Sequence, residues 1–224
     1  MQFALRDAFN QTQDWTSGIA RLYYVLTQDF LYSDPEKLVI FADNHDLTRY
    51  FTSVGEDLNK WKMGMAFLLT TRGVPVIYYG TEILMTGDAG TGHGHIREDF
   101  PGGWLEDSIN AFNELGRSPK QSEAFNYIQK LLQWRDQKEV IHSGKLKHFV
   151  PQDEVYSFFR YNDKDCVMVI LNNSDQDKTV DMGRFNESTN SYMTGTEVMT
   201  GKVFDIKSPL KISPKSALIL ELGR

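Results

Sequence analysis

Two uninterrupted apolar runs stand out in the first half of the chain, and polar residues follow each of them directly. The first run is Leu38–Ala42, followed by the sequence DNHD at residues 43–46. The second run is Val74–Tyr79, followed by Gly-Thr-Glu at residues 80–82. Strands buried on both faces are continuously apolar, and parallel strands covered by helices are their usual setting. We therefore predict two parallel strands with polar residues at their carboxyl ends, where such folds place their chemistry.

Apolar residues spaced three and four apart predict helices around these strands. We expect helices over Trp15–Phe30 with Asp14 as its cap, over Asn59–Thr71, and over Pro119–Ser143. The residues expected on the inner faces of the last two are Trp61, Met65, Leu68 and Leu69, and Phe125, Ile128, Leu131 and Leu132. Closely spaced glycines before Trp104 predict a long functional loop or a mobile lid.

The pattern changes after Gly144. Short β-rich runs separated by turn-forming residues follow, at 146–150, 155–161, 166–172, 196–199, 203–206 and 217–222. This pattern predicts an antiparallel β-sandwich. We therefore expect an α/β region at 1–144 and an all-β domain at 145–224.

Composition and charge narrow the choice of partners. The chain has 30 acidic and 24 basic residues and a formal charge of −6, which disfavours nucleic acid and anionic membrane surfaces and suits a neutral ligand. The single cysteine, Cys166, lies in an apolar run and is expected to be a buried, inert thiol. No apolar run reaches the roughly 18 residues that a membrane span needs, and the chain does not open with a signal-peptide pattern, so the compartment stays unknown.

Three motifs carry a resemblance to a known family. The sequence FADNHD at 41–46 resembles the motif that closes the seventh barrel strand of the α-amylase superfamily, glycoside hydrolase family 13. RGVPVIYYGTE at 72–82 resembles that family's eighth strand, and REDFPGGW at 97–104 is similar to a loop of its neopullulanase and cyclomaltodextrinase branch. The resemblance implies an α/β region that is the last part of a (β/α)8 TIM barrel, about two strands with helices, followed by an amylase-type all-β domain.

The resemblance also assigns roles to individual residues. It implies that Asp46 grips sugar hydroxyls and helps to stabilise an oxocarbenium-like transition state, that His45 binds the same sugar, and that Asn44 orients the turn. Arg97 would reach a neighbouring sugar subsite, and Trp104 would stack on a sugar face. An ordinary turn with a capping aspartate and a solvated histidine also fits residues 43–46, and Arg97 could equally be a solvated loop residue.

For other polar residues near the strand ends and in the following loop, structural or solvated roles are preferred over roles in sugar or metal binding. If the chain lacks the family's catalytic acid, Glu82 is the best-placed carboxylate to take that role. A structural hydrogen bond or ion pair is nevertheless the preferred interpretation of Glu82. Asp43 is expected to be structural, and Arg49 to be an ion-pair partner for a barrel carboxylate. His93 and His95 raise a metal hypothesis, but a solvated loop is preferred. We expect no metal and no cofactor; calcium is an option by family analogy, without an evident ligand loop.

The resemblance implies a retaining hydrolase of α-1,4 or α-1,6 glucosidic bonds in starch, pullulan, cyclodextrins or maltooligosaccharides. Such chemistry needs two carboxyl groups about 5–5.5 Å apart. Neither the family's Gly-x-Arg-x-Asp motif nor its acid Glu motif occurs here. We therefore expect that the chain begins after the sixth strand, is inactive alone, and exposes a barrel edge open to self-association. The alternative is a non-catalytic sugar-binding or assembly module.

Overall fold

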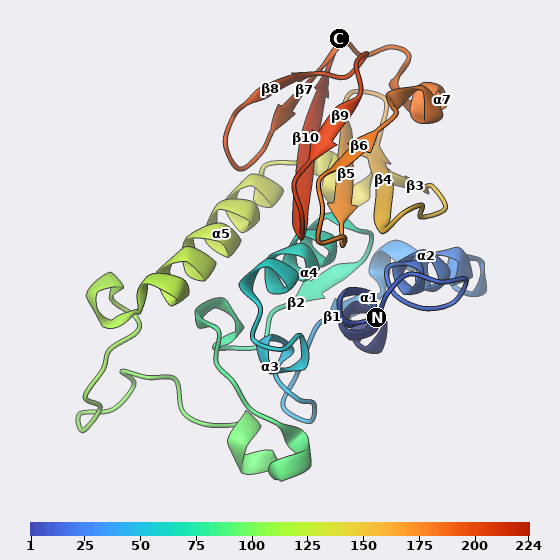
Figure 1. The fold of residues 1–224 in the computed structure, drawn as a ribbon. Helices are drawn as coiled ribbons and strands as arrows, with labels where there is room; N and C mark the ends of the chain where they lie inside the picture. The colour runs from blue at the N-terminus through green and yellow to red at the C-terminus, as the bar shows by residue number, and fades with distance from the viewer.

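Helix α4, Leu58–Thr70, lies at the centre of the molecule (Figure 1). The computed structural model describes all residues from 1 to 224. Nine of the 13 residues of α4 are buried. The side chain of Asp57 accepts hydrogen bonds from the backbone N–H groups of Asn59 and Lys60 and so caps the first turn. The predicted Asn59–Thr71 helix and its inner face are confirmed, because all four residues expected there are fully buried.

Strands β1, Val39–Phe41, and β2, Val74–Val76, pair in parallel, with Ile40 opposite Pro75. The predicted parallel pair is confirmed. One face of the pair is open within this chain, as expected for two strands of a barrel, because Val39, Val74 and Val76 are exposed while Ile40 is buried in the core that contains α4. Only one face of this pair has helices against it within the chain.

The amino-terminal helices differ most from expectation. Helix α1 spans Gln2–Asn10 and was not predicted, whereas α2 spans only Ala20–Thr27 of the predicted Trp15–Phe30 helix. The side chains of Trp15 and Phe30 are 85% and 82% exposed. The reason is Gly18, whose φ of +60° turns the backbone before α2 begins. Asp14 does not cap α2; it accepts a hydrogen bond from the N–H of Trp15.

The third predicted helix is divided in two. Helix α5 spans Pro119–Asp136, and a capping box between Ser118 and Gln121 starts it. Residues 137 and 138 interrupt the helix before the short α6, Glu139–Ser143. Of the predicted inner face, Ile128 and Leu131 are buried, whereas Leu132 and Phe125 are at least partly exposed. The remaining short helical segments are α3, Tyr50–Ser53, α7, Asn186–Thr189, and 3-10 turns at Gln28–Leu31, Pro35–Lys37, Thr81–Ile83, Ala89–Thr91, His93–Ile96, Glu114–Gly116 and Met182–Phe185.

The second half is antiparallel β structure, as predicted. A six-stranded sheet has the order β3-β4-β5-β10-β7-β8, and a two-stranded sheet pairs β6 with β9. The strands are β3 Lys145–His148, β4 Val155–Tyr161, β5 Cys166–Asn172, β6 Lys178–Val180, β7 Thr194–Glu197, β8 Val203–Asp205, β9 Leu210–Ile212 and β10 Ser216–Gly223. The short strands β6 and β9 were not predicted.

Alternate residues of the large sheet face two different cores. Phe158 of β4 and Val169 of β5 join the 31-residue core that also holds α4, β1 and the amino-terminal helices. Phe159 and Met168 face the other way, into a 12-residue core closed by β6 and β9. The sheet therefore packs against α4 on one side and against the small sheet on the other, which is the sandwich that the sequence predicts. None of the helices is both long and apolar enough to cross a membrane.

Replacing Phe67 by alanine tests the shared core. The ring of Phe67 on α4 is fully buried, and its centroid lies 5.6 Å from that of Phe158 and 6.4 Å from that of Tyr156 on β4. Truncation should lower the free energy of unfolding by about 3–5 kcal/mol, because a cavity opens between helix and sheet. Urea denaturation measures the loss. The control, Phe30→Ala at an exposed ring, should change it by about 0.5 kcal/mol or less; equal losses in the two variants would contradict the packing described.

Candidate active site

Asp43 fixes the start of the loop that follows β1. Its buried carboxylate accepts a 2.7 Å hydrogen bond from the backbone N–H of Tyr50 and 3.1 Å bonds from the hydroxyl of Thr81. Burial raises the pKa of Asp43, and these hydrogen bonds and the nearby Arg49 charge oppose that rise. Asp43 thus joins the end of β1 to the segment after β2, in keeping with the structural role expected for it.

Residues 44–46 form a tight turn beyond Asp43. The side-chain oxygen of Asn44 accepts a 2.9 Å hydrogen bond from the N–H of Asp46, a turn geometry that asparagine favours. The side chains of His45 and Asp46 are more than half exposed, and His45 Nε2 lies 3.2 Å from Asp46 Oδ2. The turn therefore presents a carboxylate and an imidazole side by side to solvent.

Arg97 approaches the same carboxylate from the loop after β2. Its Nη2 lies 2.9 Å from Asp46 Oδ1, and its Nε donates a 2.8 Å hydrogen bond to the carbonyl of His45. His93 Nδ1 lies 3.2 Å from the same Nη2. Each oxygen of Asp46 therefore has its own basic partner. The structure brings together Asn44, His45, Asp46 and Arg97 of the five residues predicted for the site.

Trp104 is the predicted residue that does not join this cluster. Its indole N–H donates a 3.1 Å hydrogen bond to Asp99, and its backbone N–H donates to Asp107. The ring is exposed, so it presents an apolar surface on the loop and does not contact the Asp46 cluster.

Two tyrosines hold the loop that carries Arg97. The Tyr79 hydroxyl donates a 2.8 Å hydrogen bond to the carbonyl of Glu98, and the Tyr78 hydroxyl lies 3.4 Å from the carbonyl of Ile96. Further along, the Thr48 hydroxyl donates to Asp88 at 3.0 Å. These contacts are not evident from the sequence, because the partners are 18 and 19 residues away.

Arg49 departs from its predicted role. Its guanidinium makes no ion pair; it lies fully buried, 4.3 Å from the ring centroid of Tyr78 and 4.8 Å from that of Tyr79, and donates to the carbonyl of Tyr79. Its Nε and Nη2 have no hydrogen-bond partner. Within this chain the expected ion pair with a barrel carboxylate is not formed; the two rings and the carbonyl of Tyr79 hold the charge in place.

Glu82 is partly buried beside the same cluster. Burial raises the pKa of its carboxyl group, with smaller opposing effects from the backbone N–H groups of residues 80 and 82 and from Arg49. Glu82 forms no ion pair within this chain.

The histidines of the loop do not form a metal site. His95 lies 3.7 Å from Glu98, while His93 contacts Arg97, and no group of three His, Cys, Asp or Glu side chains is arranged to hold a metal ion. Sequence analysis weighed His93 as a metal ligand or as part of a solvated loop, and did not find its contact with Arg97. Its contact with Arg97, four residues on, arises from the 3-10 turn at His93–Ile96.

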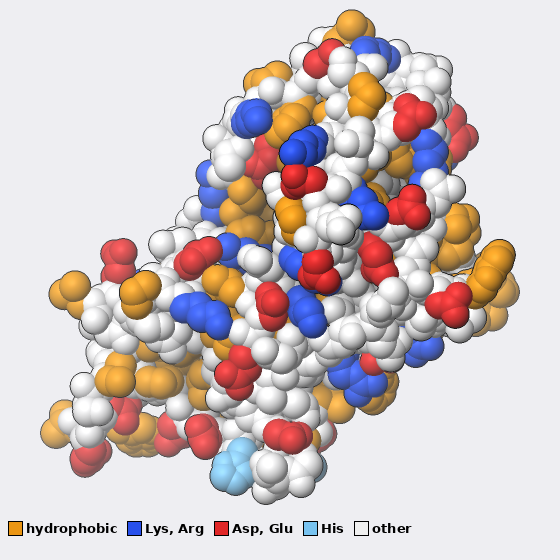
Figure 2. Space-filling view, viewed as in Figure 1, with side chains coloured by type: hydrophobic (Ala, Val, Ile, Leu, Met, Phe, Trp, Pro, Cys, Tyr) orange, Lys and Arg blue, Asp and Glu red, His pale blue; other side chains and the backbone are white.

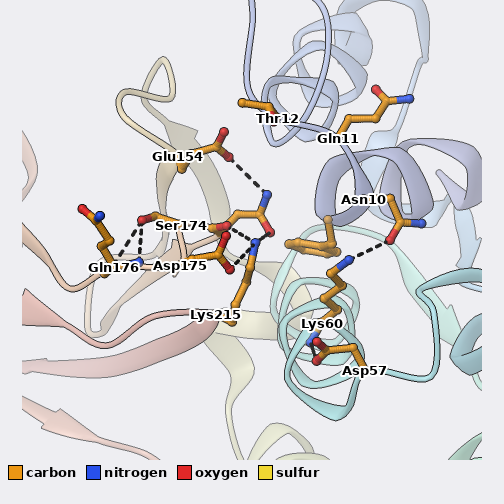
Figure 3. A pocket seen from close by; sticks show the side chains of 12 residues that line it. Asn10, Gln11, Thr12, Asp57, Lys60, Glu154, Ser174, Asp175, Gln176 and Lys215 are labelled. Carbon is orange, nitrogen blue, oxygen red and sulfur yellow. Dashed lines mark hydrogen bonds and ion pairs between the residues drawn. The ribbon is translucent and has the colours of Figure 1, made fainter.

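A polar hollow of about 670 Å³ lies at the seam between the α/β region and the β-sandwich and shares no residue with the Asp46 cluster (Figure 3). Figure 3 shows that its side chains pair with one another: Lys60 Nζ with Asn10 at 3.2 Å, and Lys215 Nζ with Asp175 at 3.5 Å. These charged groups therefore already have partners, and the hollow is a self-paired polar seam.

Comparison with known families gives a match for each half of the chain. Residues 1–103 match the family described as the α-amylase catalytic domain. Residues 146–221 match the family described as the cyclomaltodextrinase C-terminal domain.

Individual proteins are also similar to the chain. It is 35% identical over 136 residues to a cyclomaltodextrin glucanotransferase from Geobacillus stearothermophilus, covering 61% of this chain and 16% of that protein. It is 27% identical over 197 residues to a β/α-amylase from Paenibacillus polymyxa, covering 85% of this chain and 14% of that protein. The chain thus spans less than a fifth of the length of these relatives.

The fold is that of solved α-amylases. The structure of the α-amylase from Geobacillus thermoleovorans, complexed with acarbose, superposes with a TM-score of 0.74 at 17% identity, covering 100% of this chain and 46% of that one. At this level of identity the likeness shows the shared fold.

Two substitutions of Asp43 test its buried hydrogen bonds. Asp43→Ala leaves the Tyr50 N–H and the Thr81 hydroxyl without an acceptor and should cost about 1–3 kcal/mol of unfolding free energy. Asp43→Asn keeps an acceptor oxygen and should cost less. Urea denaturation at neutral pH measures both; equal losses would contradict the role of the oxygen.

The raised pKa of Asp43 also predicts a pH effect. Because the folded state holds this proton more tightly than the unfolded state, the stability gained from protonation is present at low pH and falls as pH rises from about 4 through the raised pKa. Asp43→Asn should remove this part of the pH dependence. Urea midpoints of the two proteins across pH 4 to 7 give the comparison, and parallel curves would refute the assignment.

Proposed function

Since its two halves match the α-amylase catalytic domain and the cyclomaltodextrinase C-terminal domain, the chain belongs to the α-amylase family, and we propose that it supplies the Asp46 part of an α-glucan-binding cleft. The whole protein is proposed to be a retaining hydrolase of α-1,4 or α-1,6 glucosidic bonds. Starch, pullulan, cyclodextrins and maltooligosaccharides are its proposed substrates.

The observation that carries this proposal is the position of Asp46. It lies in the turn directly after β1, exposed to solvent, with Arg97 on one carboxylate oxygen and His45 on the other. A carboxylate accepts hydrogen bonds through both oxygens, so it can take two neighbouring hydroxyls of one sugar ring. In this proposal, a sugar replaces part of the Arg97 and His45 contacts when it binds.

The neighbouring residues suit the same ligand. His45 has an exposed ring that can donate to a hydroxyl, and Arg97 provides fixed guanidinium donors beside it. Asn44 sets the turn that aims both Asp46 and His45. The exposed Trp104 ring is proposed to stack on a sugar further along the chain.

The charge of Asp46 gives it a part in the reaction. Glycosidic bond cleavage passes through an oxocarbenium-like state that carries positive charge, and a nearby carboxylate stabilises that charge. We assign Asp46 this role, and not that of nucleophile or general acid. Asp43 is a poor substitute for Asp46, because its carboxylate is buried and bound by the Tyr50 N–H and the Thr81 hydroxyl.

The proposal predicts that the 224 residues alone do not hydrolyse glucans. The chain offers Asp46 as a stabilising acid but no pair of residues assigned as nucleophile and proton donor. Incubation with maltoheptaose, β-cyclodextrin and pullulan, followed by reducing-sugar detection, should show no turnover above background. A turnover rate of about 1 s⁻¹ or more, typical of enzymes, would reject this assignment of roles.

Asp46 should nevertheless contribute to sugar binding. Asp46→Asn keeps the shape of the side chain but removes its charge, and should weaken maltoheptaose binding about tenfold, because hydrogen bonds to a charged group are lost. Chemical shifts of the His45 ring measure this binding. Asp163→Asn, an exposed aspartate of the β4–β5 turn, is the matched control; unchanged binding in Asp46→Asn would remove Asp46 from the sugar site.

A further inference from the structure

A second hollow lies between the segment before α2 and the loop that joins β3 to β4. It measures about 650 Å³, within the range of ligand sites, and shares no residue with the Asp46 cluster. Aromatic and polar side chains line it together, with Trp15, Tyr23 and Tyr24 on one side and Pro151 on the other. Figure 2 shows hydrophobic side chains gathered at the edge of the molecule over α2.

The aromatic rings of this hollow form a supported platform. Tyr23 is held from behind by His148, with ring centroids 4.7 Å apart, and by the buried Tyr156 at 6.5 Å. Tyr24 meets Tyr23 edge to face at 5.7 Å and remains 40% exposed. Trp15 adds a third ring, the most exposed tryptophan of the chain. Large rings that stay open to water while their neighbour is fixed are suited to stacking on an apolar ligand face.

The polar groups of the hollow are fixed as well. The Gln13 side chain donates a 3.1 Å hydrogen bond to the carbonyl of Pro151 and accepts a 2.8 Å bond from the N–H of Glu154. One oxygen of Asp14 accepts from the N–H of Trp15, which leaves the second oxygen available. No lysine or arginine lines the hollow, so it lacks the cation that an anionic ligand would need.

We propose that this hollow is a second binding site for α-glucan chains, separate from the Asp46 cluster. Sugar rings have an apolar face and a rim of hydroxyls, which correspond to the exposed rings and to the free acceptor of Asp14. The proposal rests on the proposed function for the class of ligand. When one glucan chain binds at both sites, binding at the second site raises the local concentration of the chain at the first. Even weak binding at the second site therefore increases the overall affinity.

Two sets of nuclear magnetic resonance signals test this proposal in one titration. The indole N–H of Trp15 reports on the hollow, and the His45 ring reports on the Asp46 cluster, with Trp15→Phe and His45→Gln used to assign them. Titrating the full chain with maltoheptaose should shift the Trp15 signal in a saturable way. Tyr24→Ala should weaken that binding about tenfold, because a stacking ring is lost, whereas Phe30→Ala, an exposed ring outside the hollow, should not change it.

The outcomes separate the two proposals. If the Trp15 signal shifts and Asp46→Asn leaves its binding curve unchanged, the second site is supported. If only the His45 signal shifts, the second site is overturned and the proposed function stands; if neither shifts, both fail. If the Trp15 signal depends on protein concentration and not on sugar, a second copy of the chain covers the hollow and the glucan site is overturned.

Discussion

Burial of helix α4 is the constraint on which the rest of the structure depends. The helix contributes to a single core of 31 residues that includes β1, the amino-terminal helices and one face of the six-stranded sheet. Phe67 touches aromatic rings of β4, while Leu68 and Leu69 lie in the same core as Ile40 of β1. Apolar burial on this scale is the main favourable term in folding, so the α/β region and the sandwich stabilise each other.

The same packing sets the geometry of the Asp46 cluster. Ile40 anchors β1 in the core and β2 pairs with β1, and from these strands a short series of polar contacts leads to the site. Asp43 ties the end of β1 to Thr81, and Tyr79 ties the end of β2 to Glu98, next to Arg97. The exposed Asp46 and Arg97 therefore meet because buried or half-buried groups behind them are held in place, a typical arrangement for a site on loops.

The sequence predicted features that depend on local pattern. Strands β4 and β5 have the predicted bounds, because long apolar runs between turn-forming residues allow few other structures. Prediction from the sequence failed where the local structure depends on a contact with a residue distant in the sequence or on a single backbone angle. Trp15 has helical spacing, yet Gly18 turns the chain before the helix starts, and no pattern within the sequence indicated that Arg49 would stack on Tyr78 and Tyr79.

The shared core has a consequence for how such chains diversify. A β domain joined through a flexible linker can be exchanged between relatives as a unit, but here one face of the large sheet is also the outer wall of the α4 core. A sandwich taken from another relative would meet α4 with a different set of ring and branched side chains. Recombination at the α6–β3 junction is thus expected to succeed only when α4 and the inner residues of β4, β5 and β10 are inherited together.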